Sequence, residues 1–224
     1  MRNSSPANFQ ATKAYDVLIA APLIVFYGFS MGGLLPQFLA ASRSWPSWDS
    51  VLQLSALTSN MFYFAMVVAL IFLRRMPTAK SAGLWPRTVA LLGGNLLIAL
   101  LALPKVSLSP FRAALSTALA GGGTLTEIVI LFWLGRSFSL LPEARRLVTN
   151  GPYRHIRHPL YLAGLIGSLG VMLQFRQPWA LLIVLATFAL QITRMNYEEQ
   201  VLSRAFPEYE IYATRSWRLV PGVY

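Results

Sequence analysis

The sequence predicts an all-α fold, a polytopic membrane helix bundle with five to six transmembrane helices. Hydrophobic residues make up 55% of the 224 positions and charged residues only 12%, about half of the ~25% charged share of a soluble domain. The mean hydropathy is +0.53. A soluble domain of this size needs more polar surface than this composition supplies. Cysteine is absent, which excludes a disulfide framework, a thiolate metal site and a cysteine nucleophile.

Six apolar runs account for the expected helices. They are Val17–Leu39, Val51–Leu73, Leu84–Leu103, Ala113–Leu134, Leu160–Phe175 and Trp179–Thr193. The second run carries no charge and is long enough to cross a hydrocarbon core of ~30 Å. The last two runs are short and need tilt, interfacial ends or flanking residues to span. Five full spans with one broken or tilted helix is therefore the alternative to six spans.

The basic residues predict the orientation of these spans. Nineteen Lys and Arg against eight Asp and Glu give a net charge of +11. All but four of the basic residues fall on one side of the predicted membrane; the exceptions are Arg43, Lys105, Arg112 and Arg176. Because Lys and Arg accumulate in cytoplasmic loops, we expect a cytoplasmic C-terminus, and a cytoplasmic N-terminus if there are six spans. Contact with anionic membrane lipids explains the charge better than nucleic-acid binding does.

The distribution of polar residues divides the chain into two regions. Residues 1–134 hold the N-terminal transmembrane helices, and residues 135–224 hold a cytoplasmic loop, a helical hairpin and a C-terminal helix. The connection Gly135–His158 is long for a loop between two helices, and long ordered loops are typically functional. Both histidines lie in this second region.

A first polar cluster lies where the long connection meets the fifth run. An Asn-Gly-Pro turn is followed by Pro159, which suits the first position of a helix. His158 then lies at the helix entrance, and Tyr161 shares its face. With Arg154 and Arg157 nearby, the exposed N–H groups of the helix form an anion site. The alternative is an interfacial basic loop that contacts lipid headgroups.

A second polar cluster follows the last apolar run. Arg194 and Glu198 are spaced i,i+4 and share one helix face. They form either a surface ion pair worth ~0.3–0.5 kcal/mol or one half of a site for a zwitterionic ligand. The intervening helical hairpin is expected to bring His158 and Tyr161 back beside this pair.

Two motifs in the second region resemble a known family. The run Leu147–Tyr161 contains Leu-Val-Thr-Asn-Gly-Pro-Tyr-Arg and Arg-His-Pro-Leu-Tyr, and Arg194–Glu199 reads Arg-x-x-x-Glu-Glu. Together they are similar to the signature of the isoprenylcysteine carboxyl methyltransferases, integral membrane enzymes related to phospholipid N-methyltransferases. The C-terminal residues Phe206–Gly222 resemble the end of that family, so the likeness covers roughly Leu134 to Tyr224.

The resemblance implies S-adenosylmethionine as the cofactor, bound by the cytoplasmic loop and the C-terminal helix. The residues it assigns to the cofactor are Arg145, Arg146, Leu147, Val148, Tyr153, His158, Pro159, Leu160, Tyr161 and Glu198. It makes Arg194 and Glu198 the catalytic residues, with Arg194 facing the methyl acceptor. A carboxylate and an ammonium on the cofactor suit cationic groups and Glu198, respectively. No metal is needed, and two histidines at i,i+3 without a nearby acid make a poor zinc site.

The acceptor and the compartment are open at this point. We expect a lipophilic acceptor from the bilayer, a carboxylate such as a prenylated cysteine C-terminus, with a phospholipid amine or a small thiol as alternatives. The predominance of arginine over lysine favours a bacterial protein, hence the inner membrane with the site on the cytoplasmic side. A small membrane transporter is the non-enzymatic alternative, but transport sites lie near the bilayer midplane.

Two further features lie inside the apolar runs. Glu127 is an intramembrane acid, and such residues are functional candidates; it either lines an acceptor tunnel or hydrogen-bonds a neighbouring helix. Gly164, Gly167 and Gly170 make a small-residue face, for which close helix packing is the favoured interpretation.

Overall fold

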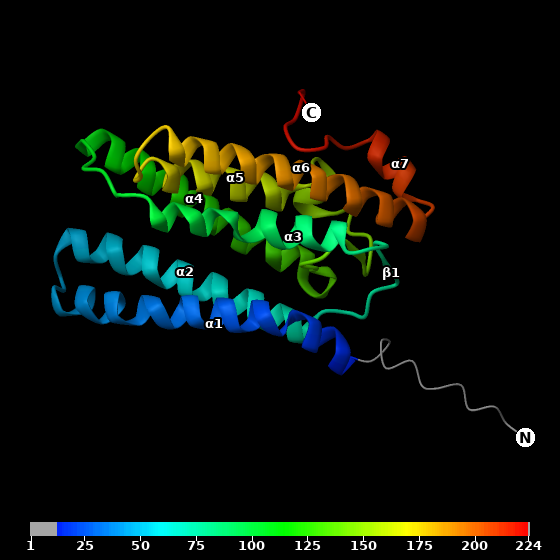
Figure 1. The fold of residues 1–224 in the computed structure, drawn as a ribbon, viewed down its shortest axis with the longest axis horizontal. Coiled ribbons are helices and arrows are strands. Elements are labelled where there is room, and N and C mark those ends of the chain that lie inside the picture. Colours follow the sequence, from blue (N-terminus) through cyan, green and yellow to red (C-terminus); the bar gives the residue numbers. More distant parts are fainter. Residues whose placement is uncertain (1–12, 224) are drawn as a thin grey trace, which may run out of the picture. The chain divides into compact units, whose positions relative to one another are not determined.

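A computed structural model describes residues 13–223, and these form two compact units that divide at Met76 and Pro77. Almost all regular structure in both units is helical, so the predicted all-α fold is confirmed (Figure 1). The functional division at residues 134 and 135 is a different boundary and stays a prediction.

The first unit is a helical hairpin of α1 (Lys13–Arg43) and α2 (Trp48–Leu73). These helices contain the first two predicted runs. A short turn joins them, and Ser47 caps α2 by accepting a hydrogen bond from the Ser50 backbone N–H at 3.2 Å. Such a cap satisfies one of the backbone donors that a helix start leaves without a partner.

A buried ion pair ties the beginning of α1 to the end of α2. Arg74 Nε donates to Asp16 Oδ2 at 2.9 Å, and Arg74 Nη2 donates to the Asp16 carbonyl at 3.0 Å. Lys13 Nζ donates to the Arg74 carbonyl at 2.7 Å. Buried charges persist where they are paired and hydrogen-bonded, and here the pairing fixes the register of the two helices.

The second unit holds the remaining elements. In chain order they are β1 (Ala79–Lys80), α3 (Trp85–Asn95), η2 (Leu96–Ala102), α4 (Pro110–Leu134), η3 (Gly135–Ser137), β2 (Glu143–Ala144), η4 (Gly151–Arg154), α5 (Pro159–Met172), α6 (Trp179–Ala205) and α7 (Tyr209–Thr214). Figure 1 shows α3, α4, α5 and α6 running alongside one another. The two short strands pair antiparallel, with Lys80 opposite Glu143.

The third predicted run is not one continuous α-helix. It changes from α3 to the 3-10 helix η2 after Asn95. Gly93 lies against α6, where an added Cβ would meet the Leu190 side chain at 3.2 Å. Gln191 Nε2 donates to the Gly93 carbonyl at 2.9 Å. Glycine weakens a helix interior, and the Gln191 amide satisfies a carbonyl at the point where the helix changes.

Helices α4 and α5 pack closely through small residues. An added Cβ on Gly123 would lie 2.5 Å from the Gly167 Cα atom. Ser116 Oγ donates to the Gly170 carbonyl at 2.8 Å, so α5 runs antiparallel to α4. The expected packing role of the glycine face is confirmed, because backbones approach this closely only where side chains are missing.

Within residues 13–223, five helices are long and apolar enough to cross a membrane, namely Lys13–Arg43, Ser50–Leu73, Trp85–Ala102, Pro110–Ser137 and Trp179–Ala205. Helix α5 has 14 residues, about 21 Å at 1.5 Å per residue, which is short of a ~30 Å core. It nevertheless leads back along α4, and the Val106 N–H donates to the Gln174 carbonyl at 3.0 Å beyond its end. The described residues thus form a polytopic helical bundle of an integral membrane protein, with five long apolar helices and the shorter apolar helix α5.

Candidate functional site

Three predicted site residues meet where α5 and α6 lie side by side. Tyr161 on α5 donates through its hydroxyl to Glu198 Oε1 on α6 at 2.6 Å. Arg194 Nε donates to the same oxygen at 3.1 Å, and its guanidinium lies 5.3 Å from the Tyr161 ring centroid. The expectation that the hairpin joins the two polar clusters is confirmed.

The carboxylate of Glu198 retains one oxygen for a further partner. Its side chain is 20% exposed, and both hydrogen bonds that it makes within residues 13–223 fall on Oε1. Arg194, only 9% exposed, also donates through Nη2 to the Ser139 carbonyl at 3.4 Å. A half-buried carboxylate with a vacant acceptor position beside a fixed cation is suited to a ligand that carries an ammonium.

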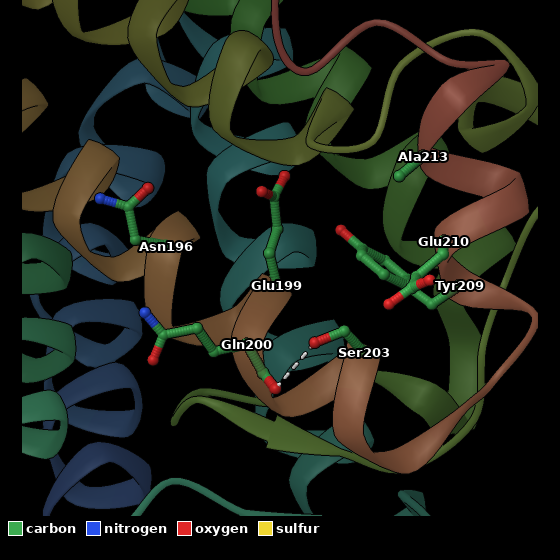
Figure 2. A pocket seen from close by; sticks show the side chains of 7 residues that line it. All are labelled: Asn196, Glu199, Gln200, Ser203, Tyr209, Glu210 and Ala213. Carbon is green, nitrogen blue, oxygen red and sulfur yellow. Dashed lines mark hydrogen bonds between the residues drawn. The ribbon is translucent and has the colours of Figure 1, made fainter.

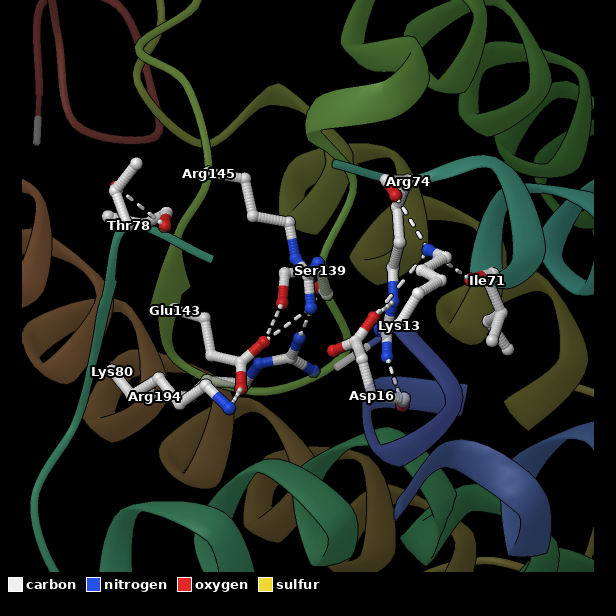
Figure 3. A network of polar contacts seen from close by, with 11 residues as sticks. Lys13, Asp16, Ile71, Arg74, Thr78, Lys80, Ser139, Glu143, Arg145 and Arg194 are labelled. Carbon is white, nitrogen blue, oxygen red and sulfur yellow. Dashed lines mark hydrogen bonds and ion pairs between the residues drawn. The ribbon is translucent and has the colours of Figure 1, made fainter. Parts of the chain in front are cut away.

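A chain of polar contacts continues from Arg194 to the paired strands (Figure 3). Ser139 Oγ donates to Glu143 Oε2 at 3.2 Å, and Arg145 Nη2 lies 2.6 Å from the same oxygen. Lys80 Nζ lies 4.0 Å from the other carboxylate oxygen. Arg145, assigned to the cofactor on the resemblance, is therefore a buried partner of Glu143.

The entrance of α5 carries a second carboxylate cluster, centred on Glu199. His158 immediately precedes the helix, and its Nε2 lies 3.0 Å from Glu199 Oε1. Arg157 Nε and Arg218 Nε donate to that same oxygen at 3.1 and 3.2 Å. The predicted anion site at this entrance thus holds the carboxylate of the chain's own Glu199, while Arg154 is exposed.

The segment after α7 braces the helix entrance through its backbone. The Arg157 N–H donates to the Trp217 carbonyl at 2.8 Å, and the His158 N–H donates to the Arg218 carbonyl at 3.1 Å. Arg157 Nη1 also donates to the Ser216 carbonyl at 2.6 Å. The His158 ring, held in this way, lies with its centroid 5.5 Å from that of Tyr161, so the two carboxylate clusters are in contact.

The apolar members of the predicted set form a packed layer beneath the connection. Tyr153, Val148 and Leu160 pack with Ile130 and Ala163. Pro159 occupies the first turn of α5 and is buried, Leu147 is half-buried, and Arg146 is exposed. The predicted cofactor residues therefore fall into several groups: Tyr161 with Glu198, His158 in the Glu199 cluster, Arg145 paired with Glu143, the exposed Arg146, and this packed layer.

Two tyrosines fix the layer to α7. The Tyr212 hydroxyl donates to the Tyr153 carbonyl at 2.7 Å. Burial raises the pKa of the Tyr212 phenol to about 12 and raises the pKa of Tyr153 well above its usual range. Both phenols stay protonated at neutral pH, so Tyr212 remains a donor.

A hollow of about 400 Å³ lies between α6 and α7 (Figure 2). It is lined by Asn196, Glu199, Gln200, Ser203, Tyr209, Glu210 and Ala213. It adjoins the Glu199 cluster and contains none of the residues assigned to the cofactor. Among the described residues, no group of three or more His, Cys, Asp or Glu side chains could hold a metal ion.

Sequence reasoning missed the partners that organise both clusters. Glu199 is the second acid of the Arg-x-x-x-Glu-Glu motif, but the motif does not show that its carboxylate accepts a hydrogen bond from Arg218. Ser139 and Glu143 belong to no motif of the sequence, so no local signal marked either of them. The i,i+1 spacing of Glu198 and Glu199 places them on different faces of α6, and this spacing was the available clue to their separate roles.

The region that is similar to known proteins contains Tyr161, Arg194, Glu198 and Glu199. Residues 111–209 match the model of the phospholipid methyltransferase family. A protein-S-isoprenylcysteine O-methyltransferase B of Arabidopsis thaliana is 33% identical over 108 residues, which cover 45% of this chain and 55% of the relative.

Two bacterial relatives carry metal-resistance names. The nickel-cobalt-cadmium resistance protein NccN of Alcaligenes xylosoxydans xylosoxydans is 35% identical over 35% of this chain and 38% of its own length. The cobalt-zinc-cadmium resistance protein CzcN of Cupriavidus metallidurans is 37% identical over 34% of this chain and 35% of its own length. The matches with these two proteins and with the Arabidopsis relative thus span between 35% and 55% of each relative's own length. The matched region, residues 111–209, is similar to the phospholipid methyltransferase family, and the chain also has a region of similarity to an isoprenylcysteine O-methyltransferase.

Proposed function

We propose that this protein is an integral membrane methyltransferase that moves a methyl group from S-adenosylmethionine to a lipophilic acceptor. The observation that carries the proposal is the cluster of Tyr161, Arg194 and Glu198 within the region that matches the family. The polar side chains gather at one end of α5 and toward the C-terminal end of α6, which disfavours a transporter with a site at the bilayer midplane.

The residues present fit the amino-acid end of the cofactor. The second oxygen of Glu198 is positioned to accept from an ammonium, and Tyr161 fixes the first oxygen at 2.6 Å. Arg145 is occupied by Glu143, so the exposed Arg146 is the cation of the assigned set that is left for the cofactor carboxylate. The cofactor supplies the methyl group on a positively charged sulfur.

Arg194 is proposed to hold the acceptor in line with that methyl group. When bound beside Glu198, S-adenosylmethionine would supply an electrophilic methyl group to the carboxylate acceptor that Arg194 holds, and would be left as neutral S-adenosylhomocysteine. Opposite charges are neutralised in this step, so a site that excludes water favours it, and alignment of acceptor and methyl supplies much of the rate.

A carboxylate such as the C-terminus of a prenylated cysteine is our first candidate acceptor, supported by the Arabidopsis relative. A phospholipid amine is the second, because the matching family is described as phospholipid methyltransferases. We propose that the acceptor comes from the bilayer and that the site faces the cytoplasm, in a bacterial inner membrane. The basic residues that accumulate on that side support this orientation.

Two substitutions test the division of roles. Glu198→Gln is expected to raise the dissociation constant for S-adenosylmethionine, since a neutral amide pairs poorly with an ammonium. Arg194→Ala is expected to leave cofactor binding nearly intact and to abolish turnover. Arg194→Lys restores turnover only in part, because an ammonium lacks the planar fork that grips a carboxylate.

The measurement combines calorimetric binding with single-turnover methylation of labelled prenylcysteine and phosphatidylethanolamine acceptors. Equal loss of cofactor binding and turnover in Glu198→Gln and Arg194→Ala contradicts the proposed division of roles. Arg194 and Glu198 would then act only as an ion pair between successive turns of α6. Methylation of neither acceptor by the parent protein contradicts both acceptor candidates.

A further inference from the structure

The C-terminal segment displays large apolar side chains outside every membrane-crossing helix. Ile211 is 59% exposed, Trp217 51%, Val220 38% and Val223 80%. Along the long helices such exposure is expected, because lipid covers those surfaces. The last of the candidate spans ends at Ala205, so the exposure of apolar side chains in the segment 211–223 needs a separate explanation.

Backbone hydrogen bonds fix where this segment lies. The Trp217 N–H donates to the His155 carbonyl at 2.9 Å, and the Arg157 N–H donates to the Trp217 carbonyl at 2.8 Å. The paired residues directly precede Pro159, the first residue of the apolar helix α5. The segment is therefore held level with the first residue of an apolar helix, and we take this level as that of the membrane interface.

The charges around the segment match an anionic surface. Arg154, Arg204 and Arg215 are all exposed, and they lie in or beside the segment and the residues with which it pairs. Tryptophan with aliphatic side chains and arginine is the composition of an interfacial anchor. We propose that residues 211–223 form a membrane-interface anchor seated on anionic lipid headgroups of the same bilayer that holds the helices.

The anchor is connected to the candidate site. Its backbone holds Arg157 and His158, and the His158 ring lies 5.5 Å from that of Tyr161. An anchored segment keeps the residues at the start of α5 rigid. If the proposed function holds, the affinity for S-adenosylmethionine is therefore expected to be higher in anionic bilayers than in detergent.

The natural absence of cysteine allows the anchor to be tested with single labels. Val223→Cys and Val220→Cys are labelled with the environment-sensitive dye NBD, and Glu210→Cys, an exposed polar position on α7, is the matched control. The full chain is reconstituted in vesicles of phosphatidylcholine alone or of equimolar phosphatidylcholine and phosphatidylglycerol. Labels at 220 and 223 should be quenched by nitroxide-bearing lipid and shielded several-fold from iodide, relative to the label at 210.

The result also has to depend on lipid charge. NBD emission at 223 should shift to shorter wavelength when phosphatidylglycerol is present; the same emission in both vesicles overturns the assignment to anionic headgroups. Full iodide access without nitroxide quenching overturns the anchor. Shielding that disappears at a low protein-to-lipid ratio shows a second copy of the chain instead and also overturns it. None of these readouts involves cofactor or acceptor, so they are independent of the proposed function.

Discussion

The Glu199 cluster leads to a quantitative prediction about the C-terminal segment. Glu199→Gln removes the charge on which Arg157 Nε, His158 Nε2 and Arg218 Nε converge within 3.0–3.2 Å. Charge-assisted hydrogen bonds are worth about 1.5–3 kcal/mol each. The three share one oxygen of a side chain that is 22% exposed, so their contributions do not add. We therefore expect a total of about 2–3 kcal/mol, below the upper end for breaking a buried pair.

Because the backbone bonds of the segment remain, the loss should appear as local opening rather than as global unfolding. At about 1.4 kcal/mol per tenfold change, it corresponds to a roughly 30- to 140-fold faster exchange of amides at residues 155–158 and 216–219. Hydrogen–deuterium exchange with mass spectrometry measures it in detergent. Glu210→Gln, at an exposed position, is the control. Unchanged protection in Glu199→Gln, or equal loosening in the control, would refute the reasoning.

The other predictions concern packing and orientation. Gly123→Ala places a Cβ 2.5 Å from the Gly167 Cα atom and should cost about 1–3 kcal/mol by overpacking. Gly122→Ala, which meets nothing within 4 Å, should be neutral, and equal falls in the thermal unfolding midpoint would contradict the close approach of α4 and α5. A reporter fused to the C-terminus should be cytoplasmic, since most Lys and Arg lie on that side; a periplasmic signal would reverse the orientation.

Hydropathy alone located the long apolar helices, because helices that face lipid have long runs of apolar residues. The runs at Val17–Leu39 and Val51–Leu73 lie inside α1 and α2. The short run at Leu160–Phe175 became the short helix α5, as its length predicted. The change from α3 to 3-10 geometry was not predicted, because it depends on an amide of Gln191 from another helix. Such a contact between segments far apart in the chain has no local pattern.

The candidate site was predictable to a similar extent. Spacing within one hairpin was sufficient to bring Tyr161 beside Arg194 and Glu198, since each lies at a defined turn of its helix. The pairing of Arg145 with Glu143 was not predictable, because the local sequence around a loop arginine does not show whether its partner is a ligand or a buried acid. The hydrogen bonds between Trp217 and the residues before α5 likewise involve backbone groups, which leave no trace in side-chain patterns.

Calorimetric titration of S-adenosylmethionine into the detergent-solubilised protein tests the central claim most directly, when the parent is compared with Tyr161→Phe. The substitution removes the 2.6 Å hydrogen bond that orients Glu198. Ordering the freed carboxylate on binding costs about 0.5–1.5 kcal/mol, which corresponds to roughly 2- to 12-fold weaker binding. Tyr209→Phe is the control, because among the described residues the Tyr209 hydroxyl is buried without a hydrogen-bond partner. We expect the parent and the control to bind S-adenosylmethionine equally and Tyr161→Phe to bind it several-fold more weakly. Binding by Tyr161→Phe that equals the parent's, or no binding by the parent, would contradict this expectation.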